Sequence, residues 1–133
     1  MRNFNLPEMV KHYAIAALWS TNDDSDTETG GAPMDTNYTI DDISAATMAE
    51  MQADCADFTK NNQADLLLYC EKMAHGEWSG EAMAGQDFWL TRNRHGAGFW
   101  DRGLGELGQR LTRAAQVSSG VDLYVGDDGK IHA

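Results

Sequence analysis

The sequence is poor in cysteine and in positive charge, and it contains no long hydrophobic run. Its 133 residues include only two cysteines, Cys55 and Cys70, which is too few for a small disulfide-stabilised scaffold. No hydrophobic region typical of a secretory signal precedes the first helical pattern. No run approaches the ~18 apolar residues that a membrane span needs. We therefore expect a cytoplasmic protein whose two thiols are reduced and buried.

Basic residues are outnumbered by acidic ones, with 10 Lys and Arg against 21 Asp and Glu, so the net charge is −11. Eleven of the carboxylates lie between Asp23 and Asp65, where Lys60 is the only base. Such a chain repels phosphate backbones and anionic lipid, so we expect neither direct nucleic-acid binding nor membrane binding. A basic protein surface is the natural partner, and a solvated surface that keeps the protein in solution is the simpler alternative.

Apolar residues recur at helical spacing over most of the chain, which predicts a mainly α domain of about five helices. The first helical pattern begins near Leu6 and ends near Trp19. Ser44 and Ser79 are expected N-caps, and Asn61-Asn62 separates the second helix from the third. The third helix should close at His75-Gly76, and the fourth near Asn93 or at His95-Gly96. The last helix should use the apolar residues from Leu104 to Ala115 and end at Ser118-Ser-Gly120.

The rest of the chain is expected to form one loop and one hairpin within a single domain, 1–133. Residues 20–38 lack periodicity and are rich in Asp, Thr and Gly, which predicts an acidic, mobile loop. Residues 121–133 alternate around the Gly126-Asp-Asp-Gly129 turn, so we expect a two-stranded antiparallel β-hairpin that packs on the helices. The expected core contains Val10, Leu18, Met51, Cys55, Phe58, Leu67, Phe88, Trp89, Leu107 and Leu111.

Two metal sites can be drawn from the sequence, and neither matches a ligand pattern. A calcium loop would lack glycine at its sixth position, where Thr29 stands, and would use Asp24, Asp26, Glu28 and Asp35. A zinc site would need thiols that lie on apolar helix faces, and would use Cys55, Cys70, His75 and His95. A solvated loop and core thiols are the favoured interpretations, and no metal or cofactor is assigned.

The stretch from Ala84 to Gly103 combines arginine, histidine, aromatic rings and glycine in twenty residues. Arginine forks bind carboxylate or phosphate, aromatic rings stack on planar groups, and a histidine beside Asp87 or Asp101 can act as an acid or base. A ligand site in this stretch would use Arg92, Arg94, His95, Trp100, Asp101 and Arg102.

The same stretch also has a purely structural interpretation. Phe88, Trp89, Phe99 and Trp100 are suited to fill a core across a tight turn, and the arginines can pair with the acidic part of the chain. The sequence contains no Gly-x-x-x-x-Gly-Lys, Gly-x-Ser-x-Gly or His-Glu-x-x-His motif. We therefore assign no catalytic residue and expect a binding protein rather than an enzyme.

The string Asp87-Phe-Trp-Leu-Thr-Arg-Asn-Arg-His-Gly-Ala-Gly-Phe-Trp-Asp-Arg102 resembles small acidic proteins encoded by bacteriophages and plasmids. The resemblance extends to Leu107–Thr112, to Val121–Gly129 and to residues 41–58, and so covers most of the chain. That family has no established activity, so the resemblance implies a context only: an accessory protein of a mobile element in a bacterial cytoplasm.

This context favours one hypothesis and leaves a second open. The first is a non-enzymatic protein that binds a basic host protein, as an inhibitor of a defence or DNA-processing enzyme whose carboxylates take the place of nucleic acid. Its binding residues would be Asp41, Asp42, Glu50, Asp54 and Asp57. The alternative is a small-molecule or nucleotide-binding module built on residues 87–103. The sequence predicts no oligomeric state.

Overall fold

A computed structural model describes residues 3–25, 31–73 and 76–133. Within these residues the chain is mainly α-helical, as the sequence predicts, with five α-helices and one two-stranded antiparallel sheet at the C-terminal end. The α-helices are α1 (Leu6–Ser20), α2 (Ala45–Asn61), α3 (Gln63–Met73), α4 (Gly80–Arg92) and α5 (Glu106–Val117). The other elements are η1 (Met34–Thr36), η2 (Ile40–Asp42), η3 (Phe99–Asp101), β1 (Tyr124–Val125) and β2 (Ile131–His132).

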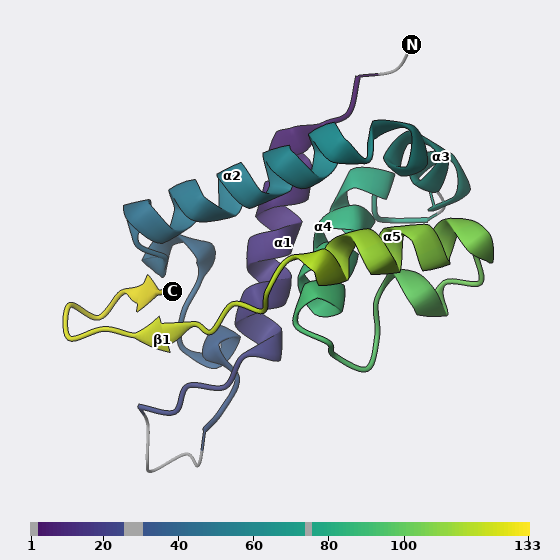
Figure 1. Ribbon diagram of the computed structural model, residues 1–133. Coiled ribbons are helices and arrows are strands. Elements are labelled where there is room, and N and C mark those ends of the chain that lie inside the picture. Colours follow the sequence, from purple (N-terminus) through teal and green to yellow (C-terminus); the bar gives the residue numbers. More distant parts are fainter. Residues whose placement is uncertain (1–2, 26–30, 74–75) are drawn as a thin grey trace.

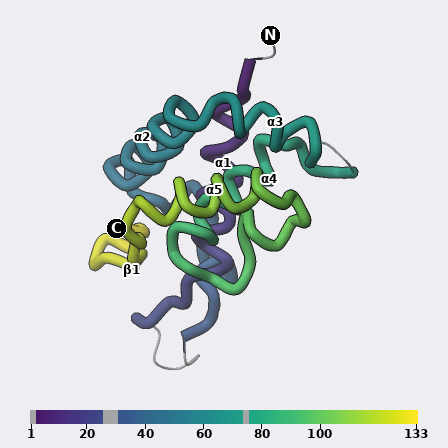
Figure 2. Tube along the Cα trace, turned by 45° about the vertical axis from the view of Figure 1, so that its right-hand side comes forward, coloured from purple at the N-terminus to yellow at the C-terminus, as the bar shows by residue number. Residues whose placement is uncertain are grey.

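Helix α1 lies in the middle of the molecule, where α2 crosses it and α4 runs beside it (Figures 1 and 2). The approach of α1 to α4 is close because Gly85 has no side chain. A Cβ atom at Gly85 would lie 2.2 Å from the Met9 carbonyl oxygen and 2.8 Å from the Tyr13 amide nitrogen. At Gly85 the backbones of α1 and α4 therefore pack directly against each other.

The helix ends follow local capping chemistry. Ser44 accepts a hydrogen bond from the Thr47 amide at the start of α2, and Ser79 accepts one from the Ala82 amide at the start of α4. Asn62 follows the last residue of α2, and its side chain donates to the Phe58 carbonyl. These three positions confirm the predicted boundaries. The predicted closure of α3 at His75 lies outside the described residues, and α5 begins two residues later than Leu104.

Aromatic rings from four segments fill the centre of the core. Phe58 of α2 stacks on Phe88 of α4 with centroids 4.1 Å apart, and on Phe99 of η3 at 5.9 Å. Tyr13 of α1 meets the Trp89 ring edge-on at 5.3 Å. Nine of the ten residues expected in the core are buried; the exception, Leu67, is half-buried. The buried face of α3 is instead Leu66, Tyr69 and Cys70.

The C-terminal hairpin packs against the start of α2, as expected. β1 and β2 pair over two residues each, Tyr124 with His132 and Val125 with Ile131. The Ile131 carbonyl accepts from the Ser44 amide at 2.9 Å, which joins β2 to the N-terminus of α2. Residues 121–123 do not pair in this sheet; the Val121 amide donates to the Asn93 side chain at the end of α4.

Both ends of the acidic loop at 20–38 are held to each other. The Asp23 amide donates to the Ala32 carbonyl at 2.8 Å, and the Met34 amide donates to the Thr21 carbonyl at 2.9 Å. Met34 is buried in the core. The tip, which contains Asp26 and Glu28, lies outside the described residues, as does His75. The calcium and zinc ligand sets that the sequence does not favour therefore lie partly outside the described residues.

Candidate functional site

Asp87, in the middle of α4, is completely buried, and its carboxylate is bound by polar side chains from two other segments of the chain. Tyr69 of α3 donates a hydrogen bond to its carboxylate at 2.5 Å. The Arg102 guanidinium, just after η3, binds the same carboxylate through Nε and Nη2, with the shortest contact at 2.8 Å. Burial, followed by the Asp87 charge, raises the pKa of the Tyr69 hydroxyl, which therefore stays protonated.

Arg92, at the end of α4, is likewise held by several hydrogen-bond partners. It is 7% exposed, and its guanidinium donates to Asp54 of α2 at 2.8 Å and to the Tyr13 hydroxyl at 3.1 Å. It also donates to the Ser119 carbonyl through two nitrogen atoms. The guanidinium lies 5.4 Å from the centre of the Phe88 ring. Arg92 therefore ties α1, α2 and the segment after α5 to α4.

The loop between α4 and η3 is fixed by Thr91. Its hydroxyl accepts from the Phe99 amide at 3.1 Å, and a Cβ atom at Gly98 would lie 2.3 Å from that hydroxyl oxygen. Gly98 has a φ of 158°, and the Asp101 carboxylate accepts from its amide at 3.2 Å. Gly98 therefore lets the loop pack closely against α4.

The six residues proposed as a ligand site have different surroundings in the described part of the chain. Arg92 and Arg102 point to internal carboxylates, and Asp101 caps η3. His95 is exposed and lines a polar cavity of about 560 Å³ with Asp24 and Asp122. Trp100 and Arg94 are also exposed, and Arg94 has a φ of 58°. His95 and Asp87 are not brought together as an acid–base pair. These contacts favour the structural interpretation of the stretch.

We predict that replacing Arg92 with alanine lowers the free energy of unfolding by about 2–3 kcal/mol without any ligand present, because the buried Tyr13 hydroxyl loses its partner. Chemical denaturation measures the change. Arg113→Ala, on the exposed side of α5, is the matched control and should stay within about 0.5 kcal/mol of the native protein. Equal stability of Arg92→Ala and the native protein would contradict this role.

The carboxylates proposed for partner binding are distributed over η2 and one side of α2. Asp41 is exposed, and Asp42 accepts from the Thr39 amide in a capping box. Helical spacing places Glu50, Asp54 and Asp57 on a single side of α2, which we call the acidic edge. Glu50 and Asp57 are exposed, whereas Asp54 is paired with Arg92 and keeps 40% of its side chain exposed.

The acidic edge forms one wall of a cleft between α2 and the C-terminal end of α5. The cleft has a volume of about 300 Å³, and Asp54 and Asp57 line it together with Asn61, Ala114 and Val117. The C-terminus of a helix carries partial negative charge. Two carboxylates and the end of α5 therefore face the same space, which suits a cationic side chain.

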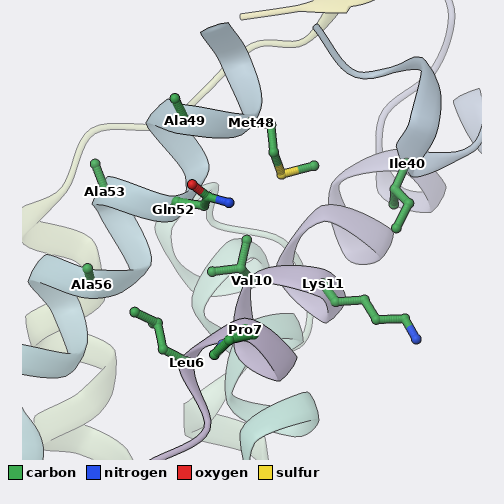
Figure 3. Close-up of a pocket in the computed structure, with 10 residues that line it drawn as sticks. All are labelled: Leu6, Pro7, Val10, Lys11, Ile40, Met48, Ala49, Gln52, Ala53 and Ala56. Carbon is green, nitrogen blue, oxygen red and sulfur yellow. The ribbon is translucent and has the colours of Figure 1, made fainter. Parts of the chain in front are cut away.

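A second surface on α2 was not expected from the sequence. Next to the acidic edge, beyond the exposed Ala49 and Ala53, a groove of about 680 Å³ separates α2 from α1 and η2 (Figure 3). Only Lys11 and Gln52 among its lining residues are polar, and the Lys11 side chain extends away from α2 (Figure 3). The apolar lining consists of Leu6, Pro7, Val10, Ile40, Met48, Ala49, Ala53 and Ala56.

The described residues contain no group of three or more His, Cys, Asp and Glu side chains placed to hold a metal ion. Cys55 and Cys70 are both buried in the core, and burial raises the pKa of the Cys55 thiol. In the described part of the chain, no helix combines the length and the apolar character required to cross a bilayer.

Comparison with known proteins adds no further assignment. No family model matches the chain, and neither a curated protein nor a solved structure does.

Proposed function

We propose that this protein is a non-enzymatic binding protein that uses the acidic edge of α2 and its cleft against α5 to bind a basic surface of another protein. The observation that carries the proposal is that three arginines form ion pairs within the chain. Arg92, Arg102 and Arg110 are bonded to Asp54, Asp87 and Asp65 of the same chain. Three of the ten Lys and Arg residues are thus paired with carboxylates of the same chain, while Glu50 and Asp57 remain exposed.

The electrostatic consequence is a negative surface at the acidic edge. The net charge of −11 produces a long-range field that attracts a basic partner, and the carboxylates along α2 can replace phosphates at a nucleic-acid-binding surface. Such binding weakens with salt because each contact made with a basic side chain displaces counterions. The resemblance to proteins of mobile elements favours a partner from the bacterial host. A defence enzyme or a DNA-processing enzyme is the class of partner that we propose.

The test is capture of proteins from bacterial lysate by tagged protein at low salt, followed by elution with a salt gradient and mass spectrometry. We expect a nucleic-acid-binding protein to elute at moderate salt. The double variant Glu50→Gln, Asp57→Asn should capture at least about tenfold less, because it removes two charges from the interface. Asp54 is kept, since it holds Arg92.

The matched control removes the same charge elsewhere. Asp122→Asn together with Asp127→Asn changes two exposed residues near the hairpin and should leave capture unchanged within about twofold, apart from the small loss of long-range attraction. Equal losses from both double variants would show that only net charge matters. Capture that persists unchanged at high salt would refute electrostatic binding altogether.

A further inference from the structure

We infer that the apolar groove between α1 and α2 is a docking site for an amphipathic α-helix of the partner protein. This inference rests on the proposed function, since it assumes that α2 faces a protein partner. The groove and the acidic edge adjoin on the exposed side of α2, where Ala53 lies about one helical turn from both Glu50 and Asp57. A partner that contacts the acidic edge is therefore within reach of the groove.

The dimensions of the groove match those of a helix face. Ala49, Ala53 and Ala56 line it over eight residues of α2, a length of about 10 Å for seven steps of 1.5 Å. Apolar anchors at positions i, i+3 or i+4, and i+7 of a bound helix span the same length. The alanine methyl groups are short, so a helix axis can approach α2 to within about 8–10 Å. Ala49 and Ala53 are exposed, which leaves this wall open.

The walls of the groove favour a helix over an extended strand. Two helices, α1 and α2, form most of the lining, and backbone groups within a helix are already bonded to one another. A strand lying here would find no backbone edge to pair with. A helix satisfies its own backbone and offers only side chains to the groove.

The charges around the groove define both the composition and the direction of the bound helix. Glu50 and Asp57 follow beyond the alanine ridge of α2, so lysine or arginine on that flank of the bound helix can reach them. The exposed Asp41 follows Ile40 at one end of the groove, and Lys60 lies one turn beyond Ala56 at the other. The positive N-terminus of the bound helix therefore points toward Asp41 and its C-terminus toward Lys60.

A second copy of the same chain is a poor occupant. Each copy carries a net charge of −11, and the carboxylates next to the groove would face those of the other copy. Like charges placed opposite each other at an interface oppose association.

The test uses two synthetic 18-residue helical peptides as probes, with leucine at i, i+3, i+4 and i+7. One has lysine and the other glutamate at its polar positions. Amide signals of the ¹⁵N-labelled full chain are followed by NMR during titration. We expect saturable shifts at Val10, Met48, Gln52 and Ala53 with the lysine peptide, and at least tenfold weaker binding of the glutamate peptide. A spin label at the N-terminus of the lysine peptide should broaden signals near Ile40.

Two variants test whether the lysine peptide binds in the groove or elsewhere on the surface. Ala49→Gln with Ala53→Gln places two long side chains over the groove and should weaken binding of the lysine peptide at least tenfold. Ala64→Gln, at an exposed position of α3 outside the groove, should change it less than twofold. Sedimentation of the free protein should show a monomer.

Four results would overturn the inference: no saturable binding, shifts outside the groove, equal binding of the two peptides, or a dimer in which the groove is covered. The proposed function fails separately. If the Glu50→Gln, Asp57→Asn variant captured its partner normally while the lysine peptide still bound the groove, only the acidic-edge proposal would fall. If capture stayed sensitive to salt and the lysine peptide did not bind, only the inference about the groove would fail.

Discussion

Replacing Asp87 with alanine is expected to lower the free energy of unfolding by about 3–5 kcal/mol, because Arg102 and Tyr69 are left without their shared partner inside the protein. Asp87 is fully buried and is bonded to both. A domain of this size has a total stability of about 5–15 kcal/mol, so the variant should be close to unfolding at physiological temperature. Urea denaturation monitored by tryptophan fluorescence measures the loss.

Two further variants show whether the loss comes from unpaired polar groups. Asp122→Ala, at an exposed position, should cost less than about 0.5 kcal/mol. Asp87→Leu combined with Tyr69→Phe and Arg102→Met removes all three polar groups and should recover at least about half of the lost stability, since an apolar cluster leaves nothing unsatisfied. A triple variant less stable than Asp87→Ala would show that packing, and not pairing, determines the effect.

Replacing Gly85 with alanine is expected to lower the free energy of unfolding by about 3 kcal/mol or more, at the upper end of the range for overpacked cores. The added methyl group would lie 2.2 Å from the Met9 carbonyl oxygen, and a backbone atom cannot move aside by changing rotamer. Helices α1 and α4 must therefore separate, which also loosens Tyr13 against Trp89. Thermal and urea denaturation both report this change.

The sign of the Gly85 effect is diagnostic. In the middle of an exposed helix, glycine to alanine stabilises by about 1 kcal/mol, so a stabilised Gly85→Ala protein would contradict the close approach of α1 and α4. Gly96→Ala is the control, because a Cβ atom at Gly96 meets nothing within 4 Å. Its effect should stay within about 0.5 kcal/mol.

Local sequence signals were enough to predict most of the helix boundaries. Ser44, Ser79 and Asn62 act on amides or carbonyls only three or four residues away, so their roles can be read from the chain itself. The choice of Leu67 for the core was wrong because three consecutive leucines obscure the helical period. The buried face of α3 is determined by its packing against α4, α5 and Phe99 of η3, which the periodicity of α3 does not encode.

Contacts between distant residues could not be predicted in the same way. Arg92 meets Tyr13 across 79 positions, and Tyr69 meets Asp87 across 18. The sequence showed that the arginines had two possible uses, and only the fold shows that Arg92 and Arg102 point inward. The groove was missed for a related reason. Leu6, Val10 and Met48 follow the same apolar pattern as core residues, and a pattern does not reveal which part of an apolar face is left uncovered.

The dissociation constant of the captured partner, measured against salt concentration for the native protein and for Glu50→Gln, Asp57→Asn, tests the acidic-edge proposal most directly. We predict that the logarithm of the affinity falls linearly with the logarithm of the salt concentration, and that the variant gives both a weaker affinity and a shallower slope, because fewer counterions are displaced. An affinity that does not change with salt, or the same slope for both proteins, would contradict the assignment of the acidic edge as the binding surface.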